Sequence, residues 1–295
     1  MTQYSSFTRI LFGAFGFVLL AFVGCKEDNH GIVLSATAPP LKDTSYVLDE
    51  PPPAAFKKVL LEDVTGVRCV NCPNAAAMVK TLLNKYDDTL VAIALYIKSF
   101  ETQFTRPWSG FEDLRTQYAE DIAMSVGMPI GLPGGYVDRF RFAASAALGI
   151  NQWDSRIQIR KALPSPVQIN LDYERINDSI VFKTKLTYSD AVPDANHKVA
   201  FYITEDKVIG KQATNDPDLA PYILDYEHNH VLRASVDLPL GRLLTQPLVA
   251  GRVFERDMIF KWNPQWVLEH CNLVAVVMNV ADESVVQVEE LKLTP

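Results

Sequence analysis

Residues 60–73, Leu-Leu-Glu-Asp-Val-Thr-Gly-Val-Arg-Cys-Val-Asn-Cys-Pro, decide the fold of the first half of the chain. An apolar run leads into Cys69-x-x-Cys72, and Pro73 opens an alanine-rich segment of helical character. Proline suits the first helical turn because the N–H that it lacks would have no partner there. The pattern predicts a strand that delivers two cysteines to a helix N-terminus, where free N–H groups and the dipole stabilise a thiolate.

The spacing of the cysteine pair indicates a role for each thiol in disulfide exchange. Cys69 is the attacking thiolate, with Arg68 as a neighbouring positive charge. Cys72 lies one turn further along the helix and resolves the mixed disulfide by attacking Cys69. The alternative is a closed, inert disulfide within a binding protein.

The segments around this pair predict a mixed α/β unit over residues 56–163. Residues 89–97 are almost wholly apolar, which is typical of a strand buried on both faces of a parallel sheet, so strand, helix and strand form a right-handed crossover. The expected strands are residues 57–64, 89–97 and 136–140, and the expected helices are residues 73–86, 111–126 and 151–163.

This order of elements resembles the thioredoxin fold. The resemblance implies a buried acid at Asp63, which assists proton transfer from Cys72, and a cis-proline that faces the disulfide and leaves backbone groups free for an extended peptide. Pro133 is the preferred proline because it adjoins a strand, and Pro129 is its competitor. An exposed turn acid and trans-prolines are the alternatives.

The chain departs from the thioredoxin pattern beside the cysteines, since Val67-Arg68 replaces the usual aromatic residue and Val70-Asn71 replaces Gly-Pro. The partner and the reduction potential therefore do not follow from the resemblance. An insertion at residues 98–110 carries Phe104 and Trp108 near the expected active edge. These aromatic residues either grip a partner or cover an edge of the core.

Residues 164–295 alternate between apolar and polar positions and predict an all-β domain. Seven short strands without helical periodicity indicate an antiparallel sandwich of immunoglobulin-like type, joined through residues 164–166. The expected strands are residues 167–173, 179–188, 198–207, 230–238, 253–262, 271–280 and 285–293.

His228 and His230 lie close together in sequence and raise the question of a metal site. A site needs three or four ligands, and only His270 or Cys271 would complete this one. We expect hydrogen-bonded histidines, a buried Cys271 thiol, no metal and no cofactor.

The first 25 residues have the pattern of a targeting signal. Arg9 precedes an apolar run over residues 10–23, too short for a comfortable membrane span, and the run ends at Gly24-Cys25. The ending resembles a bacterial lipoprotein processing site, which implies that Cys25 is lipidated and holds the protein at a membrane; an ordinary secretory signal is the alternative. Residues 26–55 contain two proline clusters and no period, which predicts a tether.

Composition limits the function classes that remain. The net charge is −7 and no basic cluster is interleaved with aromatic residues, so we expect no nucleic-acid partner.

The chain as a whole resembles outer-membrane lipoproteins related to a 28-kilodalton outer membrane protein. The resemblance rests on the leader, the tether, Cys69-Val-Asn-Cys72-Pro73 and residues 135–139 and 228–233. That family implies outer-membrane attachment and a thioredoxin-like domain joined to a β-sandwich. We expect a surface binding or adhesion module with a protein or peptide partner. The alternative is an extracytoplasmic thiol-disulfide oxidoreductase that acts through Cys69 and Cys72.

Overall fold

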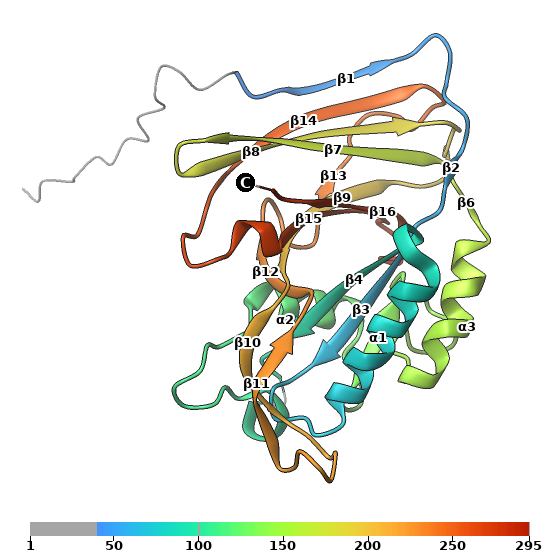
Figure 1. The fold of residues 1–295 in the computed structure, drawn as a ribbon. Coiled ribbons are helices and arrows are strands. Elements are labelled where there is room, and N and C mark those ends of the chain that lie inside the picture. Colours follow the sequence, from blue (N-terminus) through green and yellow to red (C-terminus); the bar gives the residue numbers. More distant parts are fainter. Residues whose placement is uncertain (1–39, 100, 295) are drawn as a thin grey trace, which may run out of the picture. The chain divides into compact units, whose positions relative to one another are not determined.

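The computed structural model describes residues 40–99 and 101–294, and residues 40–295 cluster as one compact unit of mixed helices and sheets (Figure 1). The expected signal peptide of residues 1–25, the lipidation site Cys25 and residues 26–39 of the expected tether lie outside the described residues. No helix in the described part of the chain combines the length and the apolar character needed to cross a membrane.

The first half has the strand and helix order that the sequence predicts. In chain order its elements are β3 (Val59–Thr65), α1 (Cys72–Tyr86), η1 (Asp87–Thr89), β4 (Leu90–Tyr96), η2 (Glu101–Thr105), α2 (Gln117–Val126), β5 (Gly134–Val137) and α3 (Ile150–Lys161). β3 and β4 run parallel, and β5 pairs antiparallel with the other edge of β3.

Helices cover both faces of these strands, which explains their unbroken apolar sequence. Every residue of β3 and β4 is buried. Successive side chains of a strand point to opposite faces, so Leu61 and Ala92 pack against α1 and α3 whereas Leu60 and Ile93 pack against α2. Helix α2 is shorter than predicted because the Thr116 side chain accepts a hydrogen bond from the N–H of Ala119 and caps the helix there.

Two packed sheets make up most of the second half. Its elements are β6 (Pro164–Ser165), β7 (Val167–Ile176), β8 (Ser179–Tyr188), β9 (His197–Glu205), β10 (Val208–Ala213), β11 (Tyr222–His228), β12 (Val231–Ser235), β13 (Arg242–Leu243), β14 (Arg252–Lys261), η3 (Leu268–His270), β15 (Cys271–Asn279) and β16 (Val285–Lys292). The strands β14, β8 and β7 form one layer, which shares a buried apolar cluster with β9 and β15 of the other.

Strands from both sides of the expected boundary at residue 164 belong to one sheet. The order β16-β15-β9-β12-β4-β3-β5 places β12 parallel to β4, with Val231 opposite Ala94. One buried cluster contains Leu60 and Val91 of the first half together with Tyr202 and Val274 of the second. The halves therefore share a sheet and a core, and the expected division into domains of residues 56–163 and 164–295 stays a prediction.

The expected tether is wrong for part of residues 40–55. β1 (Asp43–Val47) forms the edge of the sheet β1-β14-β8-β7, and β2 (Ala55–Phe56) pairs with β6. Side chains as well as the backbone hold β1, because Arg256 contacts Asp43 at 2.9 Å and the Tyr46 hydroxyl donates to Glu255 at 3.0 Å. The short strand escapes sequence analysis because its pairing partner, β14, lies far along the chain.

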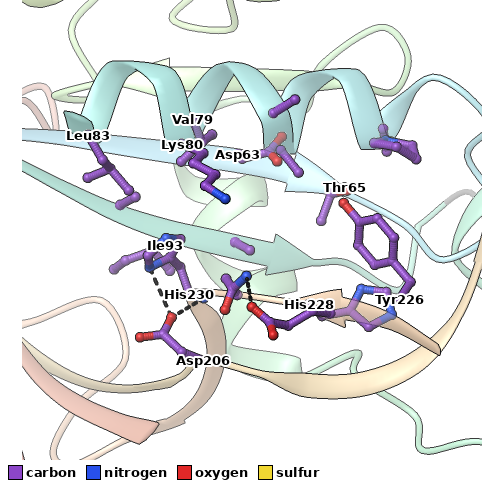
Figure 2. A pocket seen from close by; sticks show the side chains of 18 of the residues that line it. Asp63, Thr65, Val79, Lys80, Leu83, Ile93, Asp206, Tyr226, His228 and His230 are labelled. Atoms are coloured by element: carbon purple, nitrogen blue, oxygen red, sulfur yellow. Dashed lines mark hydrogen bonds and ion pairs between the residues drawn. The ribbon is translucent and has the colours of Figure 1, made fainter. Parts of the chain in front are cut away.

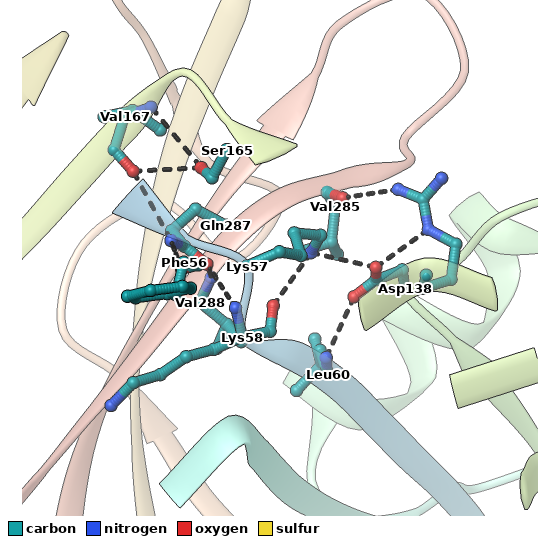
Figure 3. A network of polar contacts seen from close by, with 11 residues as sticks. Phe56, Lys57, Lys58, Leu60, Asp138, Ser165, Val167, Val285, Gln287 and Val288 are labelled. Atoms are coloured by element: carbon teal, nitrogen blue, oxygen red, sulfur yellow. Dashed lines mark hydrogen bonds and ion pairs between the residues drawn. The ribbon is translucent and has the colours of Figure 1, made fainter. Parts of the chain in front are cut away.

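A buried ionic network joins the two halves beside β5 (Figure 3). Asp138 accepts a hydrogen bond from the N–H of Leu60 at 2.9 Å. Its other carboxylate oxygen lies 2.9 Å from Lys57 Nζ and 2.9 Å from Arg160 Nε. Arg160 also donates to the carbonyl oxygen of Val285, on β16, at 3.0 Å. The charges are buried but paired, which is the condition for tolerating them in a core.

Candidate functional site

The Cys69 and Cys72 side chains form a disulfide where β3 leads into α1, with their Cα atoms 5.3 Å apart. Cys72 is the first residue of α1, and Pro73 lies in the first turn. The N–H of Cys72 donates to the carbonyl oxygen of Cys69 at 3.2 Å, which closes a tight turn at the helix start. The pair thus lies at the helix end that favours negative charge, and its role in catalysis stays a prediction.

The disulfide is covered by a segment that the sequence analysis left without a structure. Cys69 and Cys72 are each only 2% exposed. Residues 212–215, at the end of β10, lie over residues 66–71, which we call the disulfide loop. The hydrogen bonds are Gln212 Nε2 to the carbonyl oxygens of Gly66 (3.3 Å) and Cys69 (3.0 Å), Ala213 N to that of Val67 (2.9 Å), and Asn215 N to that of Val70 (3.1 Å). This segment therefore covers the disulfide loop on the Cys69 side.

The insertion at residues 98–110 lies on the same loop. Trp108 Nε1 donates to the carbonyl oxygen of Val67 at 3.2 Å, and the Arg68 guanidinium stacks 3.8 Å from the Trp108 ring centroid. The N–H of Arg68 donates to the carbonyl oxygen of Phe104 at 2.8 Å. A Cβ on Gly66 would lie 2.5 Å from that oxygen, so only glycine permits this approach. Phe104 and Trp108 thus support the disulfide loop, and partner binding through them stays a prediction.

Asp63 lies on β3 beneath α1 and is buried, with 5% of its surface exposed. Its Oδ1 atom is buried without a hydrogen-bond partner. Burial without a compensating charge raises the pKa of Asp63 to about 7. A carboxyl with this pKa exchanges its proton near neutral pH, which is the property that proton transfer at the disulfide requires.

Pro133 lies at the same end of the sheet as the disulfide loop. The Leu132–Pro133 peptide bond is cis, and Met128–Pro129 is not among the cis bonds of the described residues. Gly134 pairs with Val64 in the antiparallel register of β5 and β3, which brings Pro133 to the end of β3. Contact between Pro133 and a peptide substrate remains a prediction.

A cavity of about 590 Å³ opens beside the disulfide. Its floor is formed by β3 and β4, one wall by α1, and the other wall by β11 and the start of β12 (Figure 2). Leu83 lies toward one end and Tyr226 toward the other, and Cys72 and Asp63 both line the cavity. The volume lies within the range of small ligand sites in proteins.

His228 and His230 both line this cavity, and each has a polar partner there. His228 Nδ1 lies 2.8 Å from the Tyr96 hydroxyl, and burial lowers the pKa of His228 to about 4. His230 Nδ1 lies 3.2 Å from the Asp206 carboxylate. Among the described residues no three His, Cys, Asp or Glu side chains gather as a metal ion would need. Cys271 is a buried free thiol on β15, whose pKa is raised by burial.

The part of the site that sequence analysis missed is the hairpin of β10 and β11. Gln212 and Tyr226 contact the disulfide loop and the cavity, respectively, and neither carries a motif. The signal available was the alternation of Tyr222, Leu224 and Tyr226, which is typical of a strand. Its location above the cysteines was not available, because it depends on pairings between residues far apart in sequence.

Comparisons with known proteins point to one family. A family model described as outer membrane protein Omp28 matches residues 126–295. The solved structure of HBP35 of Porphyromonas gingivalis has a TM-score of 0.60 and 14% identity, and the match covers 82% of this chain and 77% of HBP35. A crystallised domain of the outer membrane lipoprotein Omp28 from Porphyromonas gingivalis has a TM-score of 0.32 and 19% identity, over 44% of this chain and 90% of that domain. None of the curated proteins compared matches the chain. The likeness to HBP35 shows a shared fold.

Proposed function

The chain belongs to the Omp28 family of outer membrane proteins, and from that premise we propose that it is a lipid-anchored binding protein of the outer membrane. In this proposal residues 56–163 form a thioredoxin-like scaffold, residues 164–295 form an immunoglobulin-like sandwich, and Cys25 carries the lipid. The cavity between α1 and β11 receives the ligand, and Cys69–Cys72 is a structural crosslink. Lys26-Glu27-Asp28, directly after the anchor, resembles the signal of a lysine and two acids that sends some lipoproteins to the cell surface, which accords with exposure there.

The burial of both sulfurs carries the proposal. An exchange enzyme attacks through an accessible thiolate, whereas Cys69 is only 2% exposed beneath residues 212–215. The adjoining cavity of about 590 Å³ provides the room for a ligand that the disulfide lacks. Binding therefore fits the resting structure better than exchange does.

The test is the reduction potential of Cys69–Cys72 in the soluble chain beginning at Lys26, with mixed-disulfide trapping by a Cys72→Ala variant. We expect a potential below about −300 mV and no trapped partner, as for structural disulfides. A potential between about −270 and −120 mV together with trapped proteins would contradict the proposal. A Cys69→Ala/Cys72→Ala variant is the control for non-covalent capture.

Thiol-disulfide exchange is the second candidate, and Asp63 favours it. Its pKa of about 7 suits proton transfer beside Cys72, which lines the same cavity. In this reaction the Cys69 thiolate attacks a substrate disulfide and displaces one substrate thiolate. The Cys72 thiolate then attacks Cys69, re-forms the disulfide and releases the second thiolate, so the substrate gains two electrons. An external dithiol must reduce the pair again.

A further inference from the structure

The edge of β11 borders the cavity and has no strand beside it. β10 and β11 form a two-stranded sheet, so in the described part of the chain β11 pairs with β10 alone. Side chains of successive strand residues point to opposite faces, yet residues 226, 227, 228 and 229 all line the cavity. Four consecutive residues line one cavity only if the backbone edge itself borders it. Unpaired N–H and C=O groups on such an edge are a template for another strand.

The cavity has the shape of a groove along α1. Its lining residues on that helix extend from Pro73 to Asn84, which corresponds to about 16 Å of helix length. The side chains along the middle of the groove are small: Ala76 and Ala77 on α1, and Ala92 and Ala94 on β4. At about 3.3 Å per residue, an extended segment of roughly five residues fills that length, and the alanines leave room for its side chains.

The β11 strand carries two acidic side chains, whereas the basic side chains of the cavity lining, Lys80 and Lys207, lie on α1 and directly before β10. On β11, Glu227 accepts one hydrogen bond from Asn229, and neither Glu227 nor Asp225 has an ion-pair partner among the described residues. These acids are two residues apart and so lie on one face of the strand. A strand added beside β11 would place alternate side chains next to them, where lysine or arginine is favoured. Leu224, directly before Asp225 in sequence, is an exposed apolar side chain on this strand.

We propose that the groove between α1 and β11 binds an extended, basic peptide segment of a partner protein, added to β11 as a third strand. The inference rests on the proposed binding function and names its partner class. The peptide backbone pairs with the free edge of β11, apolar side chains enter the space above Ala92 and Ala94, and basic side chains face Asp225 and Glu227. This is recognition by β-augmentation, in which main-chain hydrogen bonds provide affinity and side-chain contacts provide selectivity.

The test is fluorescence anisotropy of the full-length protein in detergent with the labelled peptide Thr-Lys-Val-Lys-Val-Lys-Val-Thr. The matched peptide carries Glu in place of each Lys. We expect the lysine peptide to bind at least about tenfold more tightly, because like charges across an interface disfavour the wrong partner. A Glu227→Lys variant should reduce this preference by about tenfold, since it reverses the charge beside the added strand.

A second pair of variants locates the binding. Ala77 is exposed and lines the groove, so Ala77→Trp fills it and should weaken the lysine peptide by at least about tenfold. Thr81 is exposed on the same helix outside the groove, and Thr81→Trp should leave binding unchanged. Circular dichroism checks that each variant is folded.

Either of two results would overturn the inference: no binding of the lysine peptide, or binding that Ala77→Trp and Glu227→Lys both leave unchanged. A failure of the proposed binding function would look different: the reduction potential of Cys69–Cys72 would lie between about −270 and −120 mV and partner proteins would be trapped. A potential below about −300 mV without peptide binding would reject only the basic peptide as the partner and would leave the binding function in place.

Discussion

Gln212 Nε2 donates a hydrogen bond of 3.0 Å to the carbonyl oxygen of Cys69, although 143 positions separate the two residues in the chain. The same amide group donates to the carbonyl oxygens of Gly66 and Ala213. One side chain thus fastens the β10–β11 hairpin over the disulfide loop. Access to Cys69 and Cys72 is therefore a property of the second half of the chain as much as of the cysteine motif.

Replacing Gln212 with alanine should make the disulfide easier to reduce. The change removes hydrogen bonds that each contribute about 1 kcal/mol, so local opening of the hairpin should become roughly 5 to 30 times more frequent. We expect the rate of reduction by dithiothreitol, followed by alkylation of the freed thiols, to rise in proportion.

The matched control is Gln158→Ala, because Gln158 is exposed on α3 away from the disulfide loop. Its rate should equal that of the unaltered protein. Equal rates for Gln212→Ala and the unaltered protein would show that reduction proceeds through some opening other than that of the hairpin.

Asp63 should make stability depend on pH in a direction opposite to that of most acids. Its pKa rises from 3.8 to about 7 on folding because of burial. Between these values the native state keeps a proton that the unfolded chain has lost, so the free energy of unfolding decreases as pH rises from about 4 to about 7. Above pH 7 this contribution stays constant.

The Asp63→Asn variant cannot titrate at this position and should lack that contribution. Urea unfolding at pH 4 and pH 8 should show the variant gaining up to about 4 kcal/mol relative to the unaltered protein at the higher pH. Asp88→Asn, at an exposed position in η1, is the control and should show no such gain. A constant difference between Asp63→Asn and the unaltered protein would mean that a counter-charge or water stabilises the carboxylate.

Replacing Asp138 should lower the free energy of unfolding more than replacing an exposed charged residue does. Asp138→Asn removes the partner of Lys57, which is buried at 2.9 Å from it, and weakens the contact to Arg160. Breaking a buried pair leaves an uncompensated charge, so we expect a loss of about 3 kcal/mol or more in the free energy of unfolding by urea. Asparagine tolerates the positive φ of 51° at this position, which keeps backbone strain out of the comparison.

Glu174→Gln provides the comparison for Asp138→Asn. Glu174 pairs with Lys183 on the surface, where the side chains are 50% and 40% exposed, and such pairs add little to stability. Similar losses for the two variants would indicate that the Asp138 network is solvated in solution.

Local patterns predicted most of the fold, and long-range pairing explains what they did not. The apolar run of β4 and the alternation of β8 identify their strands, because burial on two faces or on one leaves a direct trace in sequence. β1 leaves no such trace, since exposed side chains and a distant partner define it. On α1, Val79 and Leu83 both pack in the core cluster and line the cavity, so one helix face serves both.

The candidate site likewise has a part that local sequence predicts and a part that depends on long-range pairing. Cys69, Cys72 and Asp63 are recognisable from spacing alone, because the strand-to-helix junction that places them is local. The cover over them is not recognisable, since Gln212 acts through a hairpin whose position depends on the β12–β4 pairing. Sequence patterns therefore identify the cysteine pair and its acid, whereas the segment that covers them belongs to the second half and has no local signature.

Cutting the chain at residue 163 should test whether the halves fold alone. The N–H of Ala94 on β4 donates to the carbonyl oxygen of His230 at 2.7 Å, and Val231 pairs with Ala94 from β12. A fragment of residues 40–163 loses this neighbour, exposes the edge of β4 and uncovers the apolar side chains that pack against Tyr202 and Val274. Exposed apolar edges of this kind promote association.

We expect the fragment of residues 40–163 to be insoluble or to unfold without a cooperative transition. Co-expression with residues 164–295 should restore solubility and cooperative urea unfolding. A cooperative transition of the isolated fragment would instead establish an independent domain, and the shared sheet would then be an interface between two folded units.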